Sequence, residues 1–212
     1  MKKSVDCWAV MILAIFPILI LSASFATSAP FNVAQGKDVE LNGVFFVGGW
    51  GGGPIAAGTV LDGAFLPRGT QWDQGVWWDT STSKGEAQYI EIELDGIFRI
   101  ESFTVQADDN DGYKLYYKDL DTSAWILAYD MPAVGGWGLQ TRPNPDNNSD
   151  RYTLAVPIIT DELKIEGYFV NDGWYSVSEV QAFGTPVPEP AVMVLLGSGL
   201  IGLVGFRRKF KK

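Results

Sequence analysis

The sequence contains no histidine and only one cysteine, Cys7. Histidine is the usual general base and metal ligand near neutral pH, and cysteine is the usual thiol nucleophile and disulfide partner. Carboxylates are plentiful, but no pair of them lies in a recognisable glycosidase context. Because the common catalytic side chains are missing, we expect a protein that is not an enzyme.

The first 26 residues have the order of a secretory signal peptide. Lys2 and Lys3 precede an apolar run over residues 8–21, and the small-residue stretch SASFATSAP follows it. Positive charge, apolar core and cleavage site in this order are typical of exported proteins. We expect cleavage after Ala26, so that Cys7 is removed with the signal and the exported chain has no thiol and no disulfide.

A second apolar run covers residues 191–206 and carries no charge. As a helix it would span about 24 Å, slightly less than a typical hydrocarbon core of about 30 Å. Five of the last six residues, within 207–212, are basic, and such clusters stay on the cytoplasmic side of a membrane. We therefore expect a transmembrane helix over 191–206 and a basic cytoplasmic tail over 207–212. The alternative is a buried core helix.

The stretch VPEP, comprising Val187, Pro188, Glu189 and Pro190, stands just ahead of this apolar run. The order of motif, apolar helix and basic end resembles the PEP-CTERM sorting signal of Gram-negative bacteria. The resemblance implies a transient inner-membrane anchor that an exosortase-type peptidase cuts near these four residues. It also implies delivery to the cell surface or the exopolysaccharide matrix. A permanent tail anchor with a chance PEP motif is the alternative.

The region between the two apolar segments is strongly acidic. Residues 27–186 hold 9 of the 16 Lys and Arg residues and 23 of the 25 Asp and Glu residues, so their formal charge is −14. Such a charge repels nucleic acid and anionic lipid, and it favours cations or neutral partners. A region of this length is large enough for one domain with its own core.

Short alternating segments indicate an all-β fold for residues 27–184. In 87–94, apolar side chains alternate with polar ones, as in a strand with one buried face. No sustained helical stripe occurs, and the spacing of the segments is typical of a β-sandwich. We expect loops over 48–58 and 134–150 and a linker over 185–190. The further expected strands are 97–107, 112–119, 124–130, 151–158, 162–169 and 175–184.

The order of several of these segments resembles a discoidin-like domain, the galactose-binding-like jelly roll of the coagulation factor five/eight C type. The resemblance covers most of residues 32–184. It depends on the Leu-Asp-Gly turn at 61–63 followed by Thr70-Gln71-Trp72, on the IEIEL strand, and on the closing stretch YSVSEVQAFG. The segment 66–68 is an insertion relative to the family, and the loop over 134–150 is unusually long and rich in glycine.

The resemblance also implies a structural calcium ion, which in the carbohydrate-binding modules of this family clamps an early loop to the last strand. Carried over to this chain, the side-chain ligands would be Asp62, Thr70 and Glu179. Backbone oxygens of Thr59, Ala64 and Ser178 would complete the set, because Ca²⁺ takes six to eight oxygen ligands. The alternative is that Asp62 only forms a turn and that Glu179 is a solvated strand residue.

Tryptophans in loops are the candidate sugar-binding residues, because flat aromatic rings stack on pyranose rings. Trp50, Trp137 and Trp174 lie in glycine-rich or Asn-Asp-Gly loops, and the resemblance places Trp174 in a loop that often supplies such a platform. We expect Trp72 and Trp125 to lie in the core instead. The candidate partners for sugar hydroxyls are Asn171, Asp172, Arg142 and Asp109.

Together these features predict an exported, non-catalytic carbohydrate-binding protein of the cell surface or exopolysaccharide matrix. Its expected partners are an extracellular polysaccharide or glycan, the processing peptidase and, transiently, the inner membrane, but not nucleic acid. The alternative is a structural or adhesive matrix protein that contacts other proteins and has no specific sugar site. The first function predicts loop tryptophans exposed together at one end of the sandwich, whereas the second predicts them buried or scattered.

Overall fold

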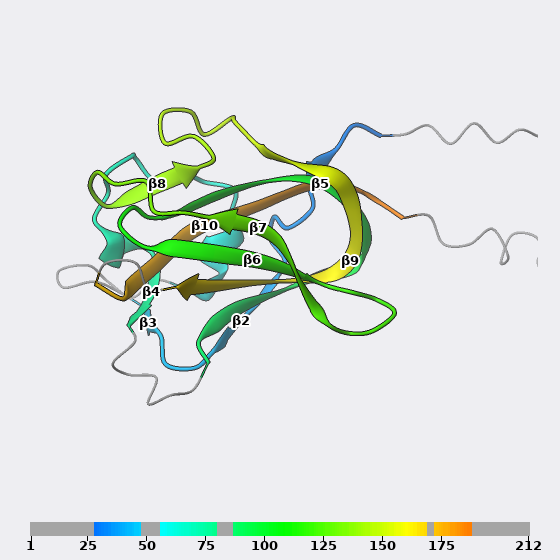
Figure 1. Ribbon diagram of the computed structural model, residues 1–212, viewed down its shortest axis with the longest axis horizontal. Helices are drawn as coiled ribbons and strands as arrows, with labels where there is room; N and C mark the ends of the chain where they lie inside the picture. The colour runs from blue at the N-terminus through cyan, green and yellow to red at the C-terminus, as the bar shows by residue number, and fades with distance from the viewer. Residues whose placement is uncertain (1–27, 48–55, 80–86, 169–171, 188–212) are drawn as a thin grey trace, which may run out of the picture.

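The computed structural model describes residues 28–47, 56–79, 87–168 and 172–187, and these form a β-sandwich (Figure 1). The expected signal peptide, the expected transmembrane helix, Pro188, Glu189, Pro190, the basic tail, Trp50 and Asn171 lie outside the described residues. The strands are β1 (Phe31–Asn32), β2 (Asp38–Asn42), β3 (Phe46–Val47), β4 (Val76–Asp79), β5 (Tyr89–Asp108), β6 (Gly112–Lys118), β7 (Trp125–Met131), β8 (Leu139–Arg142), β9 (Tyr152–Tyr168) and β10 (Trp174–Pro186). Two short 3₁₀ helices, η1 (Ala57–Leu61) and η2 (Trp72–Gln74), precede β4.

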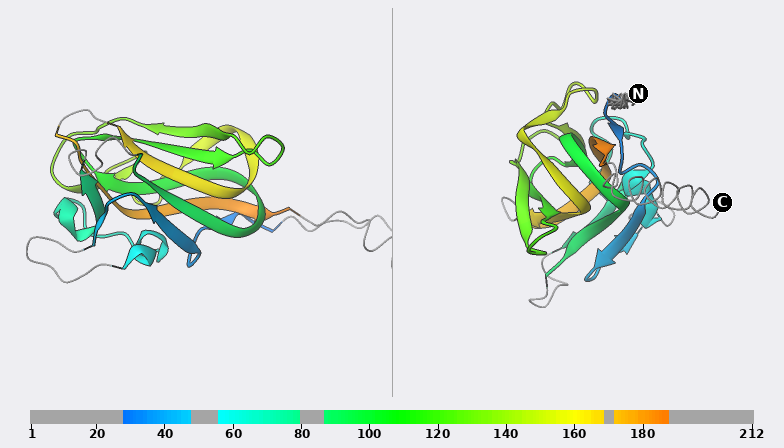
Figure 2. Two further views of the ribbon diagram at one scale, coloured as in Figure 1. Left: turned by 90° about the horizontal axis from the view of Figure 1, so that it is seen from below. Right: turned by 90° about the vertical axis from the view of Figure 1, so that its right-hand side faces the viewer.

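Two long strands, β5 and β9, each belong to both layers of the sandwich. In one layer, the first part of β5 pairs with β2 on one side and with the last part of β9 on the other. In the same layer β9 pairs with β6, and β6 pairs with β7. In the other layer, the second part of β5 pairs with β10, and β10 also pairs with β4 and β1. The change of layer in β5 occurs at Asp95 and Gly96, whose φ angles of +52° and +141° interrupt the ladder with β9. The hydrogen-bonded network is therefore continuous but folds over on itself (Figure 2).

The core lies between the two layers and follows the alternation seen in the sequence. Ile90, Ile92 and Leu94 of β5 are fully buried, while Glu93 between them is exposed. Tyr113 and Trp78 add large rings to the same core and pack edge to face with centroids 6.3 Å apart. The prediction that 87–94 is a strand with one buried face is thus confirmed, and so is the all-β fold.

Several expected element boundaries were wrong. The expected strands 87–94 and 97–107 form one bent strand, β5, and the expected strands 151–158 and 162–169 form β9. The expected loop over 134–150 contains β8, which pairs with the end of β5. The last strand continues two residues beyond 184, and the backbone N–H of Val187 still donates to the carbonyl oxygen of Ile97 (2.9 Å). In each case the residues read locally as a turn, a loop or a linker, but pairing with other strands within or beside them makes them part of a strand.

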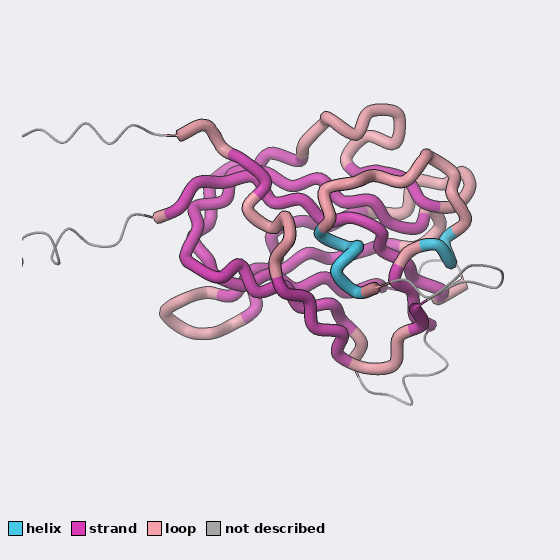
Figure 3. Tube along the Cα trace, turned by 180° about the vertical axis from the view of Figure 1, so that it is seen from behind, coloured by secondary structure: helices cyan, strands magenta, loops and turns pink. Residues whose placement is uncertain are grey.

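The sandwich has two distinct ends. The described chain begins and finishes at one of them, together with the hairpin loop between β6 and β7, which we call the terminal end (Figure 3). Residues 109–111, 132–138 and 172–173 connect strands at the opposite end, which we call the loop end. Among the described residues, no helix is long and apolar enough to cross a membrane.

Candidate functional site

An aromatic cluster holds Trp174 at the start of β10. Its ring stacks on Trp77 with centroids 5.6 Å apart and meets Trp72 edge to face at 5.1 Å. Trp77 is in turn stacked on Phe46 at 4.1 Å. Trp77 is buried, but Trp174 and Trp72 are both half-buried, so part of each ring faces solvent. The cluster therefore anchors Trp174 and leaves it partly accessible.

The expectation that Trp72 and Trp125 lie in the core was wrong, since both are only half-buried. Trp72 begins the helix η2 at the edge of the aromatic cluster. Trp125 begins β7, an edge strand, where the ammonium groups of Lys118 and Lys164 lie 5.9 and 5.2 Å from its ring. Trp77 and Trp78 are the tryptophans that are buried among the described residues, and the sequence analysis singled out neither; Trp78 packs in the core between the layers.

Trp137 is 70% exposed, more than any other large apolar side chain of the loop end. Its loop is held in place because Leu139 makes two backbone hydrogen bonds to the segment 69–70: Leu139 N donates to Thr70 O (2.7 Å), and Gly69 N donates to Leu139 O (2.9 Å). Gly138 has a φ of +64°, and a Cβ there would collide with the carbonyl oxygen of Thr70. The indole of Trp137 is thus presented to solvent on a backbone that is clamped beside it.

Asp172 links two segments of the loop end. One carboxylate oxygen accepts from the backbone N–H of Trp174 (3.0 Å), and the other accepts from the Asn110 amide (2.9 Å). Asp172 is exposed, so its remaining acceptor capacity faces solvent. The structure therefore brings Asp172 and Trp174 together, and it adds Asn110, which the sequence analysis did not identify.

Arg142 and Asp109 occupy buried positions beneath the loop end. The Arg142 guanidinium is 1% exposed and donates to the carbonyl oxygens of Ala107 (2.7 Å), Gln140 (3.0 Å), Asp108 (2.5 Å) and Asp109 (3.4 Å). It also lies 5.7 Å from the centre of the Tyr113 ring. Arg142 therefore has almost no solvent-exposed surface with which to contact a sugar hydroxyl. Its hydrogen bonds connect the end of β5 to β8.

The Asp109 carbonyl oxygen accepts from the backbone N–H groups of Val134 (3.0 Å) and Gly135 (3.3 Å), so it supports the loop that carries Trp137. The neighbouring Asp108 is almost fully buried. Burial, together with the charge of Asp109, raises the pKa of Asp108 to about 7. Both side chains are therefore buried beneath the loop end and do not lie on its surface.

Four of the six expected calcium ligands line one cavity of about 300 Å³, namely Thr59, Asp62, Ala64 and Ser178. Glu179 lies beside it, and its carboxylate accepts from the backbone N–H of Gly63 (3.3 Å) and from the Gln181 amide (3.1 Å). A β-bulge at Ser178 interrupts the pairing of β10 with β5 at this point. Thr70 does not line the cavity, and its hydroxyl donates to the carbonyl oxygen of Pro67 (2.6 Å).

The charge around this cavity suits a cation. The Glu179 side chain is fully buried, and both recorded donors to its carboxylate are neutral groups. Burial raises the pKa of Glu179 to about 8, and the charge of Asp62 adds to the effect. Within the described residues no group of three or more acidic side chains could hold a metal ion. A calcium ion here would thus need neutral oxygens as well as Asp62 and Glu179, in keeping with the expected backbone ligands.

Gln106 is a further residue that the sequence analysis missed. Its amide oxygen accepts from the backbone N–H of Leu66 (2.8 Å) and from the Ser178 hydroxyl (2.8 Å), and its amide nitrogen donates to the Leu66 carbonyl oxygen (2.9 Å). It therefore connects the inserted segment 66–68 to the bulge in β10. Glutamine in a strand gives no local signal of such a role.

The comparisons with known proteins identify the tail and the fold. The family model of the PEP-CTERM protein-sorting motif matches residues 186–209, so the expected sorting motif is confirmed. No curated protein matches the chain. The match covers only the tail, and for the domain the comparisons show the fold alone.

The chain is similar in fold to solved structures, one of them at a TM-score of 0.50. A fucolectin from the serum of striped bass (Morone saxatilis) has a TM-score of 0.50 and 14% identity, with 76% of this chain and 50% of that chain covered. The family 32 CBM of NanJ from C. perfringens, solved with galactose, gives 0.47 and 14%, covering 73% and 98%. Chitosan-binding module 1 from a chitosanase/glucanase of Paenibacillus sp. IK-5 gives 0.46 and 17%, covering 73% and 99%. The discoidin-like jelly roll is confirmed, while such low identities do not identify a ligand.

Proposed function

We propose that this chain is an exported, non-catalytic carbohydrate-binding protein of the cell surface or the exopolysaccharide matrix. The observation that carries the proposal is the exposed ring of Trp137 on a clamped loop. A large ring in solvent gives up apolar burial, and a rigid backbone lowers the entropy cost of ordering it on a ligand. An indole presented in this way suits stacking on a sugar ring.

Trp174 and Asp172 supply a second part of the proposed site. The accessible part of the Trp174 ring offers an apolar face, and the exposed Asp172 carboxylate beside it can accept hydrogen bonds from sugar hydroxyls. Sites of this type combine aromatic surface with a few well-placed polar groups. Arg142 and Asp109 act beneath this surface by holding the loops, and Trp50 and Asn171 remain candidates from the sequence alone.

Calcium is proposed as a structural ion at the cavity beside Glu179. Asp62 and Glu179 would hold it through their carboxylates, with neutral oxygens of Thr59, Ala64 and Ser178 around them. The Gly63 N–H and the Gln181 amide that donate to the buried Glu179 carboxylate are both uncharged, and a bound cation would supply a positive charge beside it. Its role would be to fasten the turn after η1 to β10, and it takes no part in any reaction.

A glycan array with the exported protein tests the sugar site directly. We expect Trp137→Ala to weaken binding by roughly five- to thirtyfold, since truncating a stacked aromatic costs about 1–2 kcal/mol. The melting temperature should barely change, because the ring is exposed. Trp174→Ala should weaken binding too and also lower the melting temperature, because its ring packs on Trp72 and Trp77.

Trp125→Ala is the matched control, since Trp125 is half-buried but lies on an edge strand outside the proposed site. It should leave glycan binding unchanged. Binding that survives Trp137→Ala and Trp174→Ala at full strength would contradict the site. If no glycan binds and these tryptophans are instead needed for adhesion to protein, the structural or adhesive function replaces this one.

The sorting tail is proposed to be cut near the PEP motif by an exosortase-type peptidase. Because β10 ends at Pro186 and Val187 makes the last backbone hydrogen bond to Ile97, a cut beyond Val187 leaves the sheet intact. Mass spectrometry of the cell-surface protein should therefore find a C-terminus close to residue 187. Replacing Pro188, Glu189 and Pro190 by alanine should retain the full tail. Recovery of intact Lys212 from the surface form would refute this processing.

A further inference from the structure

Exposed apolar side chains gather at the terminal end of the sandwich. Val156 is 75% exposed, and five others are between 40% and 49% exposed: Phe31, Ile97, Leu120, Leu127 and Ile159. Phe31 pairs with Gly184 near the end of β10, and Ile97 accepts the hydrogen bond from Val187. Phe31 and Ile97 therefore lie where the chain leaves the domain. Leu120 and Leu127 belong to the β6–β7 hairpin, which reaches the same end of the sandwich.

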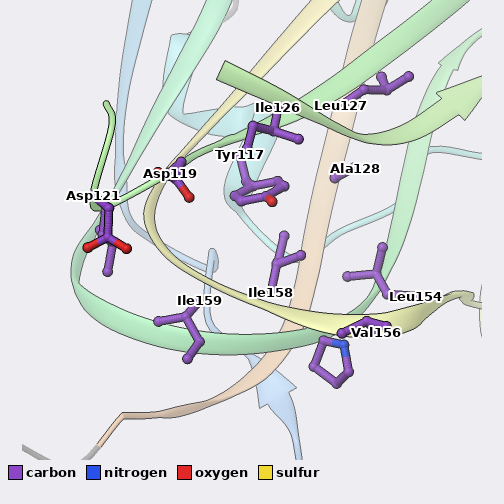
Figure 4. A pocket seen from close by; sticks show the side chains of 12 residues that line it. Tyr117, Asp119, Asp121, Ile126, Leu127, Ala128, Leu154, Val156, Ile158 and Ile159 are labelled. Atoms are coloured by element: carbon purple, nitrogen blue, oxygen red, sulfur yellow. The ribbon is translucent and has the colours of Figure 1, made fainter. Parts of the chain in front are cut away.

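A groove of about 640 Å³ continues this apolar surface between β7 and the first part of β9 (Figure 4). Tyr117 and Ile126 line one side and Ile158 lines the other. Asp119 and Asp121, in the hairpin loop, contribute acidic groups to its lining. Contiguous apolar surface of this kind is uncommon on soluble domains and marks a contact surface.

The position of the groove relative to the exit of the chain follows from the strand register. Ile159 pairs with Arg99 of β5, and Arg99 pairs with Thr185 of β10. Neighbouring strands are about 4.8 Å apart, so Ile159 lies roughly 10 Å from Thr185. Thr185 is two residues before Val187, the last described residue. The apolar surface therefore lies beside the exit of the tail.

The spacer between the sheet and the apolar run is short. Four steps of chain separate Val187 from Ala191, which is at most about 14 Å. The headgroup layer on each side of a bilayer is itself about 5–8 Å thick. If the run over 191–206 spans the membrane, as proposed above, Val187 lies within about 10 Å of the lipid surface. The terminal end is then held within about 10 Å of the headgroups.

We infer that the terminal end of the sandwich is a lipid-contact surface, on which the domain rests while its tail is in the bilayer. This inference depends on the proposed insertion of the tail. The exposed apolar side chains, led by Val156 and Ile159, contact the boundary between headgroups and acyl chains. Because Asp119 and Asp121 line the adjoining groove, the surface suits uncharged or zwitterionic headgroups more than anionic ones.

This contact also determines the orientation of the candidate sugar site. The second part of β5, from Arg99 to Asp108, runs from the terminal end to the loop end and spans about 30 Å. A domain resting on its terminal end holds Trp137 and Trp174 that far from the bilayer. The loop end therefore faces the surrounding matrix until the tail is cut.

Site-directed fluorescence can test the contact because the exported chain, expected to begin at residue 27, has no cysteine. Val156→Cys and Ile159→Cys are labelled with an environment-sensitive dye, and the exported chain with its tail intact is reconstituted into phosphatidylcholine vesicles containing doxyl-labelled lipid. Val134→Cys is the matched control, a valine at the loop end that is 38% exposed. Ser198→Cys, in the middle of the apolar run, reports on insertion of the tail.

We expect the labels at 156 and 159 to be quenched about twofold or more by the doxyl lipid, as for side chains 5–10 Å into the interface. The label at 134 should be unaffected, and that at 198 strongly quenched. If the label at 198 is quenched while those at 156 and 159 behave like the label at 134, the lipid contact is refuted. The insertion of the tail is then still supported. A label at 198 that is not quenched would instead refute the inserted tail, and with it the geometry on which this contact depends.

Discussion

Arg142→Met should destabilise the folded domain by about 3–5 kcal/mol, which is the usual cost of removing one partner from a buried charged network. The guanidinium donates four hydrogen bonds to backbone carbonyl oxygens and is 1% exposed. Methionine fills a similar volume but donates none of these bonds, so the carbonyls of Ala107, Asp108 and Asp109 lose a buried donor. Urea unfolding monitored by tryptophan fluorescence measures the loss directly.

Arg151→Met is the control for this substitution. Arg151 is exposed, and its guanidinium lies over the ring of Phe183 at 3.4 Å. Its replacement should cost roughly 1 kcal/mol or less, as for other exposed cation–π contacts. Equal effects of the two substitutions would contradict the structural role of Arg142. Loss of glycan binding in Arg142→Met without loss of stability would restore Arg142 as a ligand-binding candidate.

The strands of the core were predictable because their signal is local. In 87–94, buried Ile90, Ile92 and Leu94 alternate with polar side chains, and that period of two defines a strand with one buried face. The continuation of β5 past Asp95 and Gly96 was not predictable in this way. Such a pair usually closes a turn, and only the partners on both sides of the bend, β9 and β10, keep the strand continuous.

The site was predictable at the level of loops and much less at the level of side chains. Glycine-rich composition correctly indicated that Trp137 lies in a loop, where it is exposed. The sequence did not reveal that Trp174 packs on Trp77, because residues almost a hundred positions apart meet only through the pairing of β10 with β4. The burial of Arg142 was likewise hidden, since arginine is usually a surface residue and β8 was not expected.

For the expected calcium ligands, too, the local turn was predictable from the sequence, whereas the contact between distant segments was not. The Asp62-Gly63 turn is visible in the sequence, and Gly63 adopts a φ of +84°, which favours glycine. The pairing of this turn with Glu179 across more than a hundred residues came only from the family resemblance, and the structure does place the two together. Thr70 is held elsewhere because the inserted segment 66–68 precedes it, and Gln106 fixes that segment.

In EDTA, the free energy of unfolding should fall steeply as the pH rises from about 5 to 8. Glu179 has an ordinary pKa of 4.5 that burial raises to about 8, so across this window the folded state keeps a proton that the unfolded chain has lost. Stability is then complete below the unfolded pKa and is lost as the pH approaches the folded one. A rise of this size corresponds to about 5 kcal/mol as an upper bound. Asp108, whose pKa rises to about 7, adds to the fall in the lower part of the window.

Calcium should reverse much of this loss, because a bound cation favours the ionised Glu179. At a free concentration a hundredfold above its Kd, an ion that binds only the folded state adds about 2.7 kcal/mol, or roughly 5–10 °C in melting temperature for a domain of this size. The gain should be larger at pH 8 than at pH 5, where Glu179 holds a proton that the ion must displace. Thermal melts in calcium and in EDTA at both pH values measure it.

Glu179→Gln separates the contribution of the carboxylate from that of the rest of the cavity. Glutamine keeps the shape and can still accept from Gly63, but it neither titrates nor offers calcium a charged ligand. The variant should therefore be more stable than the parent in EDTA at pH 8 and should not respond to calcium. Between pH 5 and 8 it should lose the part of the pH dependence that comes from Glu179 and keep the part that comes from Asp108. Glu93→Gln, at an exposed position of β5, should behave like the parent in all three respects.

A parent melt that is the same in calcium and in EDTA at pH 8 would remove the ion from this cavity. If calcium has no effect on the parent but the pH dependence is still smaller in Glu179→Gln, then Glu179 of the parent is a buried carboxylate with no cation beside it. The packing of β10 on η1 and β5 must then offset the free energy cost of burying it.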